Sequence, residues 1–257
     1  MTLLSVVTIT KNEEKNLPRC LKSVQFADEI VVIDTGSTDR TIEIARETGA
    51  KVYRPEWKGF GPAKQEGVNR ASGEWVLSLD ADEELTPELA AEIQRVTNDK
   101  HEFAGFYMAR RTRFLGRWIY HCGWYPDYLL RLFRKTKGGF DGAIIHEQIR
   151  VEGKCGRLVG EILHYSYPSL ESYLEKSNRY TTMGAEQAFR QGKRAGISAI
   201  ALKPIATFIR HYIIKRGFLD GMEGLIISVL SSISVLVKYA KLRELRRQAG
   251  SRVEEDE

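Results

Sequence analysis

The feature that most constrains the fold is the stretch 75–84 (WVLSLDADEE), a short apolar run that ends in acidic residues. Its apolar part has the composition of a buried central strand. Asp80 and Asp82 follow it at alternate positions, so in an extended chain both side chains project to the same side. Thr86 and Pro87 then predict a helix start, with a capping hydroxyl and a proline at the first helical position. We therefore expect carboxylates at the carboxyl end of a strand, where open α/β sheets bind ligands.

The paired carboxylates predict a metal site. Because like charges repel, two carboxylates bind a nucleotide diphosphate only through a divalent cation, and hard oxygen ligands suit Mg²⁺ or Mn²⁺. Residues 1–100 contain neither of the glycine-rich phosphate loops, GxGxxG and GxxxxGKS/T, so phosphate must be held in another way. The alternative is a solvated acidic turn, since acids also favour helix starts.

Strand and helix patterns alternate along the first hundred residues, which predicts βαβ units and an α/β fold with a mostly parallel sheet flanked by helices. Such a sheet would gather Glu13, Asp34, Asp80 and Asp82 at one edge, because each ends or follows a strand. The predicted strands are 3–10, 29–34 and 52–53, and the predicted helices cover 17–24, 42–49 and 62–71.

Charge is unevenly distributed along the chain. Residues 1–100 hold 13 Lys/Arg and 18 Asp/Glu, whereas residues 101–253 hold 26 and 12, and the last four residues are acidic. This asymmetry predicts a catalytic half and a basic half that faces a polyanion, either nucleic acid or an anionic membrane. The three scattered cysteines fit no metal or disulfide pattern and predict a reducing, cytoplasmic setting. Met1 leads directly into a predicted strand, so we expect no signal peptide.

Three motifs in this order resemble family 2 glycosyltransferases with the GT-A fold: residues 10–14 (TKNEE), 32–39 (VIDTGSTD) and 79–83 (LDADE). The resemblance implies that the first-strand loop and Asp34 hold the base and ribose of the donor. It also implies that Asp82 binds the metal that bridges the diphosphate. A carboxylate such as Asp34 suits the imide N–H of uracil, although a turn-capping aspartate is the alternative. The predicted nucleotide-binding residues are Ile9, Lys11, Glu13, Asp34, Lys64, Asp80 and Ala81, and the predicted metal ligands are Asp82 and Asp80.

Residues 101–165 are the predicted acceptor half of a catalytic domain 1–165, and residues 1–100 are its nucleotide-sugar half. The aromatic segment 118–127 suits a carbohydrate site, because aromatic faces stack on sugar rings. Arginine favours phosphate and carboxylate contacts, although a solvated face or a packed loop would explain the same residues. The predicted acceptor-binding residues are Trp124, Tyr125, Arg131 and Arg134.

Sugar transfer needs a base that takes the proton from the attacking hydroxyl. We favour Glu147, because an acid after a short apolar run can lie at a strand end that faces the site. Asp127 is the second catalytic candidate and Asp141 a third. In some enzymes of this fold a late histidine completes the metal shell, which makes His164 a minor candidate.

Residues 166–257 predict a helical, basic region with an acidic tail. Apolar residues between 197 and 213 recur at helical spacing with basic residues at the margins. The thirteen apolar residues 225–237 are too few for a bilayer span, which needs about 20. We expect amphipathic helices that lie on an anionic membrane surface. The alternative is a pair of core helices that pack on the catalytic domain or on a second subunit.

The late motifs, 169–180 and 218–221, are similar to those of lipopolysaccharide core β-glucosyltransferases. The resemblance implies a UDP-hexose donor, with glucose as the expected sugar, and a phosphorylated lipid-linked core sugar as acceptor. We expect a metal-dependent, inverting, peripheral enzyme on the inner face of the bacterial cytoplasmic membrane, with no nucleic acid partner. The alternatives are another glycolipid, polyprenyl phosphate or protein acceptor, a nucleotidyltransferase, or a basic nucleic-acid-binding protein.

Overall fold

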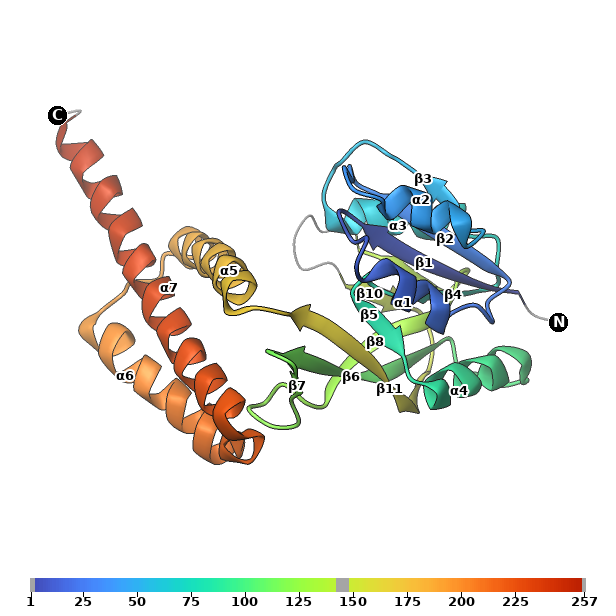
Figure 1. Cartoon of the computed structure of the whole chain (residues 1–257). Helices are drawn as coiled ribbons and strands as arrows, with labels where there is room; N and C mark the ends of the chain where they lie inside the picture. The colour runs from blue at the N-terminus through green and yellow to red at the C-terminus, as the bar shows by residue number, and fades with distance from the viewer. Residues whose placement is uncertain (1–2, 142–147, 256–257) are drawn as a thin grey trace. The chain divides into compact units, whose positions relative to one another are not determined.

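The computed structural model describes residues 3–141 and 148–255, and the chain divides into two compact units (Figure 1). Unit 1 comprises residues 1–111 and 126–165, and unit 2 comprises residues 112–125 and 166–257. The segment 112–125, which the sequence analysis assigned to the acceptor half, thus groups with the C-terminal helices.

The main sheet has nine strands, and eight of them run in the order β3-β2-β1-β4-β8-β6-β11-β5. The ninth, β7, lies in unit 2 and pairs with the end of β6 that belongs to the same unit. The first four strands of that order are parallel, whereas β8 is antiparallel to β4 and to β6, and β5 is antiparallel to β11. The sheet is therefore mixed, and the prediction of a mostly parallel sheet holds only for its N-terminal half. The strands are β1 (Leu4–Thr10), β2 (Glu29–Asp34), β3 (Lys51–Tyr53), β4 (Trp75–Ser78), β5 (Glu83–Leu85), β6 (Gly105–Phe114), β7 (Arg117–Trp118), β8 (Asp127–Arg134) and β11 (Cys155–Tyr167), with a separate pair β9 (Gly138–Phe140) and β10 (Ile149–Val151).

Helices cover both faces of the parallel half. Successive strand residues point to opposite faces, and β2 shows this, because Val31 and Ile33 pack with α3 whereas Val32 packs with α1 and α2. The helix α4 joins α1 on the second of these faces. The layers are therefore helix, sheet and helix, as expected for a GT-A fold. The helices of unit 1 are α1 (Leu17–Ser23), α2 (Thr41–Glu47), α3 (Phe60–Arg70) and α4 (Pro87–Asn98).

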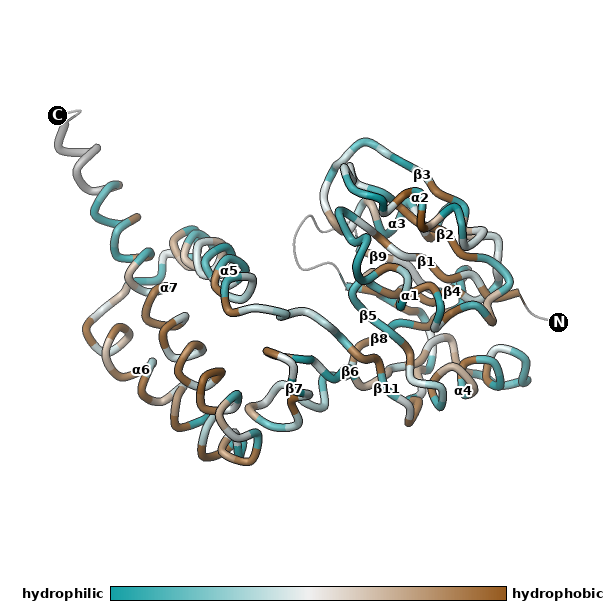
Figure 2. The backbone as a smooth tube through the Cα atoms, in the orientation of Figure 1, coloured by the Kyte–Doolittle hydropathy of each residue, from teal (hydrophilic) through white to brown (hydrophobic). Residues whose placement is uncertain are grey.

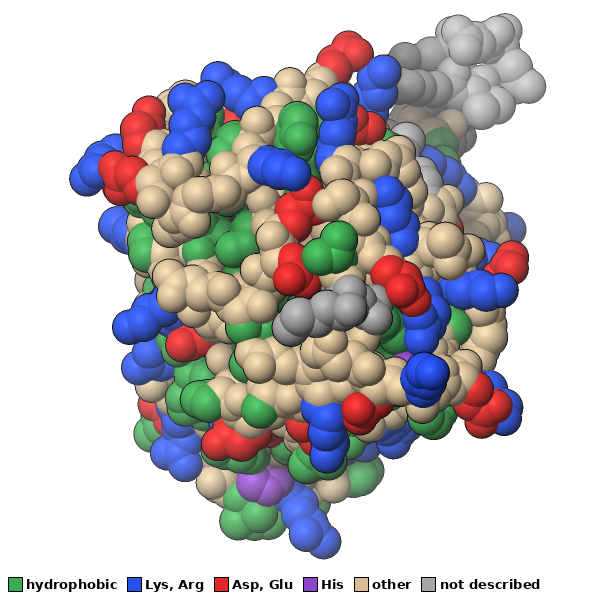
Figure 3. All heavy atoms as spheres, turned by 90° about the vertical axis from the view of Figure 1, so that its right-hand side faces the viewer, with side chains coloured by type: hydrophobic (Ala, Val, Ile, Leu, Met, Phe, Trp, Pro, Cys, Tyr) green, Lys and Arg blue, Asp and Glu red, His purple; other side chains and the backbone are tan. Residues whose placement is uncertain are grey.

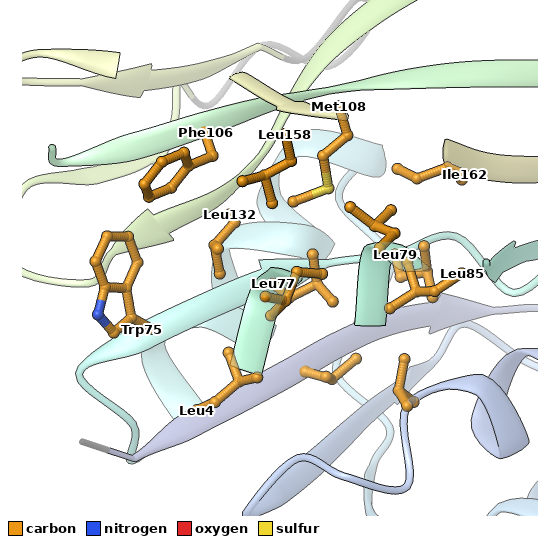
Figure 4. Packing of buried hydrophobic residues seen from close by; sticks show 14 of the residues in the cluster. Leu4, Trp75, Leu77, Leu79, Leu85, Phe106, Met108, Leu132, Leu158 and Ile162 are labelled. Carbon is orange, nitrogen blue, oxygen red and sulfur yellow. The ribbon is translucent and has the colours of Figure 1, made fainter. Parts of the chain in front are cut away.

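The largest buried cluster joins the parallel strands to the antiparallel half (Figure 4). Trp75 and Leu77 from β4 pack in it with Phe106 and Met108 from β6, and Leu132 from β8 lies between them. Burying each of these side chains contributes about 1.5–3 kcal/mol. The cluster therefore holds the parallel strands and the antiparallel strands of the sheet in a fixed arrangement next to the acidic turn.

The predicted start of α4 is confirmed. The Thr86 hydroxyl accepts a hydrogen bond from the Leu89 N–H at 3.3 Å, and Pro87 occupies the first turn. The short strand β5 between the acidic turn and α4 was not predicted. It contains two acidic residues, which strands disfavour, and it forms because β11 supplies a partner strand.

Unit 2 is built from α5 (Leu170–Arg190), α6 (Ile197–Ile209) and α7 (Gly221–Glu255), with a π-helical turn at Arg210–Ile214 and a 3₁₀ turn at Gly217–Asp220. An aromatic cluster of Phe114, Trp124, Tyr167 and Tyr173 forms one of its cores, with ring centroids 5.1–6.4 Å apart. The predicted helical character of the C-terminal region is therefore observed.

Apolar residues run along α6 and much of α7 (Figure 2). Two segments, Ile197–Ile214 and Gly217–Ala249, are long and apolar enough to cross a membrane by length and composition, and most of their residues are not buried. The argument that this region is too short to span a bilayer was therefore wrong, because it counted only residues 225–237 and ignored the continuity of the helices. Length and composition alone are weak evidence for a span.

Candidate active site

Acidic residues gather at the carboxyl edge of the parallel strands. Thr10 at the end of β1 pairs with Asp34 at the end of β2, and the Leu79 N–H donates to the Val7 carbonyl at 3.0 Å. Asp34 ends one of the two strands that flank β1 and Asp80 follows the other, so both lie at the same edge of the sheet. This is the position where open α/β sheets bind ligands.

Asp34 is fully buried and closes the turn after β2. Its carboxylate accepts hydrogen bonds from the backbone N–H groups of Gly36 and Ser37 at 3.1 and 3.2 Å, and it forms an ion pair with Arg54 at 3.2 Å. The capping role that the sequence analysis gave as the alternative is thus present. Contact with a nucleotide base stays a prediction.

Asp80 is held between two cations. Lys64 Nζ from α3 lies 2.8 Å from Oδ1, and the Arg131 guanidinium from β8 lies 2.9 Å from Oδ2. Burial alone would raise the pKa of Asp80, but the charges of Arg131 and Lys64 hold that pKa well below its usual range. Burial alone would lower the pKa of Arg131, and the neighbouring carboxylates raise it instead. Asp80 and Arg131 are therefore both charged at neutral pH.

The turn that carries Asp82 is closed by Glu83. The Glu83 N–H donates to the Asp80 carbonyl at 2.9 Å, and the Glu83 carboxylate accepts the Asp80 N–H at 3.0 Å. Glu83 is fully buried and also accepts from Arg131 at 2.8 Å and from Arg110 at 3.3 Å. A buried carboxylate is stable only when it is paired and hydrogen-bonded in this way.

Asp82 and His164 form the part of the site that best suits a metal. His164 Nε2 on β11 lies 3.2 Å from Asp82 Oδ2, and the Tyr165 N–H donates to the Asp82 carbonyl at 2.9 Å. Within residues 3–141 and 148–255, no three His, Cys, Asp or Glu groups converge to hold a metal ion. The donor set still fits Mn²⁺ or Mg²⁺, since such ions often take one or two protein ligands and complete the shell with water and substrate phosphates.

The loop after β1 carries the remaining predicted donor residues. Ile9 is half-buried and Lys11 is exposed. Glu13 accepts a hydrogen bond from Asn16 at 2.8 Å, and its N–H donates to Thr41. Ala81 is buried against α1. Lys11 and Glu13 therefore follow β1 in the chain as Asp80 follows β4, at the same edge of the sheet.

The two predicted acceptor residues of unit 1, Arg131 and Arg134, are not brought together. Arg131 is buried and engaged by Asp80 and Glu83, as described above. Arg134 pairs in register with Trp75 at the start of β4, at the opposite edge of the sheet from Asp80. There it forms an ion pair with Glu74 and stacks on the Trp75 ring at 4.5 Å.

The other acceptor-side predictions fall in different places. Trp124 belongs to the aromatic cluster of unit 2, and Tyr125 contacts Tyr120 there. Asp127 lies in unit 1 at the start of β8, where Arg110 holds it at 2.7 Å and 41% of its side chain is exposed. Glu147, the favoured base, lies outside the residues that the structure describes.

Sequence reasoning missed Glu83 and Arg110 as site residues. Their contacts are non-local, since Glu83 lies 27 residues from Arg110 and 48 from Arg131. A usable signal was present, because two strands that follow the acidic turn carry several arginines. That pattern predicts neutralising partners for the acid.

Comparisons with known proteins show which family this chain resembles. The family model described as glycosyl transferase family 2 matches residues 5–152. The chain is 30% identical over 257 residues to the lipopolysaccharide core biosynthesis glycosyltransferase LpsC of Rhizobium meliloti, covering 92% of this chain and 93% of that protein. It is also 30% identical over 268 residues to an uncharacterized glycosyltransferase of Rickettsia typhi, covering 100% of this chain and 92% of that protein. Among solved structures, residues 1–349 of TarS from S. aureus match with a TM-score of 0.45 and 17% identity, covering 96% of this chain and 92% of that one.

Proposed function

The chain belongs to glycosyl transferase family 2, and on that premise we propose that it moves a hexose from a UDP-sugar to an anionic lipid-linked acceptor, with inversion at the anomeric carbon. The observation that carries this proposal is the acidic edge of the sheet, where Asp82 lies beside His164 and Asp80 lies between two cations. A site of mixed charge that includes a metal-binding pair suits a nucleotide diphosphate better than carboxylates alone.

Donor binding is assigned to the residues at this edge. Asp82 and His164 would hold Mn²⁺ or Mg²⁺, and Asp34 would accept a hydrogen bond from the imide N–H of uracil. When bound, the ion would supply positive charge against the departing diphosphate. Lys64 and Arg131 fix Asp80, which then faces the ribose or the metal.

Transfer of the sugar requires one general base, which this chain must supply. The carboxylate of Glu147 or of Asp127 takes the proton from the acceptor hydroxyl while the hydroxyl oxygen attacks the anomeric carbon. The bond from that carbon to the diphosphate breaks on the opposite face of the sugar, and UDP leaves with the bonding electrons. The product therefore has inverted anomeric configuration.

The acceptor class is proposed from similarity and from composition. The name of the R. meliloti relative places that protein in lipopolysaccharide core biosynthesis, and the excess of basic residues after position 100 suits a phosphorylated core sugar. We propose glucose as the sugar and the inner face of the cytoplasmic membrane as the place of reaction. The helices α6 and α7 would hold the enzyme at that surface.

Calorimetry of nucleotide binding tests the donor proposal. The full chain is titrated with UDP, with UDP-glucose and with other nucleotide sugars, in Mn²⁺ and in chelator. We expect UDP binding in Mn²⁺ that weakens at least about tenfold in chelator and about as much in Asp82→Asn. The matched control is Asp99→Asn, an exposed aspartate at the end of α4, which should bind as the unmodified chain does. UDP binding that needs neither metal nor Asp82 would overturn the metal bridge, and no UDP binding at all would overturn the donor assignment.

A further inference from the structure

Charged side chains of unit 1 form a ladder in which cations and carboxylates alternate. The contacts between successive members measure 2.8, 2.9, 2.8, 3.3 and 2.7 Å. In order, the members are Lys64, Asp80, Arg131, Glu83, Arg110 and Asp127. The ladder starts at the acidic edge that the proposed function assigns to the donor and ends at a carboxylate considered as the base.

Glu83 joins the two parts of the ladder, the part that contains Asp80 and the part that contains Asp127. Its Oε1 accepts hydrogen bonds from Arg131 and Arg110, which in turn hold Asp80 and Asp127. Its side chain is completely buried, whereas 41% of the Asp127 side chain is exposed. Removing the charge of Glu83 would leave two neighbouring guanidinium groups without their shared carboxylate, so both would move.

The same side chain also fixes the turn that presents Asp82. The Glu83 carboxylate Oε2 accepts a hydrogen bond from the Asp80 N–H, and the Glu83 backbone N–H donates to the Asp80 carbonyl. Two hydrogen bonds therefore join Asp80 and Glu83, the first and last residues of the turn. Strand pairing places Glu83 directly opposite His164. The pairing of Glu83 with β11 therefore positions the two proposed metal ligands, Asp82 and His164. The Glu83 side chain holds the turn of residues 80–83, which carries Asp82.

We propose that Glu83 is a positioning residue that couples the donor side of the site to Asp127. The inference rests on the proposed function, because it takes Asp82 as a ligand of the donor metal. By holding Arg131 and Arg110 at one oxygen, Glu83 sets the distance between the metal-binding turn and the carboxylate at the start of β8. Transfer reactions depend on such fixed geometry, since small displacements of reacting groups reduce rates strongly.

A matched pair of arginine variants tests the coupling without changing net charge. Arg110→Lys keeps the cation but loses the planar fork that bridges Glu83 and Asp127. Arg111→Lys is the control, because Arg111 is the next residue of β6, projects to the other face of the sheet and forms its own ion pair with Glu161 at 2.7 Å. Both variants, together with Glu83→Gln, are titrated with UDP in Mn²⁺, and thermal unfolding midpoints are recorded.

We expect Arg110→Lys to weaken UDP affinity about threefold and Glu83→Gln to weaken it about tenfold. Arg111→Lys should bind UDP as the unmodified chain does, with a loss of thermal midpoint similar to that of Arg110→Lys. Equal UDP affinity in the two lysine variants would overturn the coupling, and so would unchanged affinity in a folded Glu83→Gln. If Glu83→Gln does not fold, the lysine pair alone decides. Failure of the unmodified chain to bind UDP would instead overturn the proposed function before any variant is compared.

Discussion

At the scale of single residues, the base is the assignment with the clearest kinetic consequence. Replacement of Glu147 by Gln removes the carboxylate that we propose takes the hydroxyl proton, so kcat should fall about 10²–10⁴-fold. UDP affinity in Mn²⁺ should stay unchanged, because the residue acts on the acceptor. Steady-state kinetics with a lipid-linked core acceptor, combined with calorimetry, would measure both quantities. Near-normal turnover of Glu147→Gln would contradict the assignment of Glu147 as the base and would favour Asp127.

Glu29, at the start of β2, gives a prediction about stability and pH. Burial would raise its pKa, but hydrogen bonds from Lys51, Ser5 and Ser72 lower the pKa to about 2, from an ordinary value of 4.5. A lowered folded-state pKa means that the carboxylate stabilises the fold above about pH 4.5, and that this stabilisation is lost as the pH falls toward 2.

Glu29→Gln should therefore lower the free energy of unfolding by about 2 kcal/mol at pH 7. The difference from the unmodified chain should shrink toward zero as the pH falls from 4.5 to 2. Urea unfolding at a series of pH values measures this difference. A deficit that is the same at pH 3 and pH 7 would show that the ionised carboxylate is not the source of the stabilisation.

The residues of the proposed donor site differed in how far they could be predicted. Asp34, Asp80 and Asp82 were predicted to share one edge because each directly ends or follows an apolar strand run, which is a local signal. The pairing of Asp82 with His164 and the burial of Glu83 depend on β5 joining β11, a contact between segments about 80 residues apart. No local pattern encodes that pairing.

At the scale of elements, the contact between β11 and α4 gives a prediction. Gly160 on β11 lies so close to α4 that an added Cβ would come within 2.5 Å of the Leu89 backbone. Gly160→Ala must therefore push the strand away from the helix, at a cost of about 2 kcal/mol. Because β11 also carries His164, the metal-dependent part of UDP affinity should fall as well.

Urea unfolding and calorimetry in Mn²⁺ and in chelator measure these two effects. Val159→Ala is the matched control, because Val159 is the preceding residue of the same strand and is 85% exposed. It should change the free energy of unfolding by less than about 0.5 kcal/mol. Wild-type stability in Gly160→Ala would mean that the strand and helix can separate without cost.

Elements with strong periodic patterns were predicted well, and those that depend on a partner strand were not. The buried runs of β1, β2 and β4 and the capping signal at Thr86 are all local, and the structure confirms them. The antiparallel pairing of β8 with β4 and β6, and of β5 with β11, gives the sheet its mixed character. Strand order is fixed by long-range packing around Trp75 and Leu132. Such packing leaves no signature in the sequence of any one strand.

At the scale of the whole molecule, the charge distribution bears on the nucleic-acid-binding alternative considered at the start. On the face shown in Figure 3, Lys and Arg side chains are interspersed with Asp and Glu. A nucleic-acid interface would instead present a patch of one sign. This face therefore gives the nucleic-acid-binding alternative no support, and the basic residues beside the apolar helices of unit 2 become the part of the chain to test against an anionic surface.

Exposed apolar residues of α6 and of the π-helical turn that follows it provide that test. Ile205 and Ile209 lie on α6 and Ile213 lies in that turn, and the three are 57%, 45% and 53% exposed. Replacing all three by Ser should lower binding to vesicles with anionic lipid at least about tenfold, because the apolar area that enters the interface is lost. Stability should change little, because about half of each side chain is already exposed to solvent.

Co-sedimentation of the full chain with neutral and with anionic vesicles measures this binding. The matched control replaces Leu170 and Leu174, exposed residues of α5, and it should bind as the unmodified chain does. If basic residues contribute to a peripheral attachment, the chain should bind neutral vesicles more weakly than anionic vesicles, and high salt should weaken its binding to anionic vesicles. Protein that resists alkaline washing would instead favour helices that span the bilayer, as their length permits. If the chain binds neither kind of vesicle, the alternative is favoured, in which α6 and α7 are core helices that pack on the catalytic domain or on a second subunit.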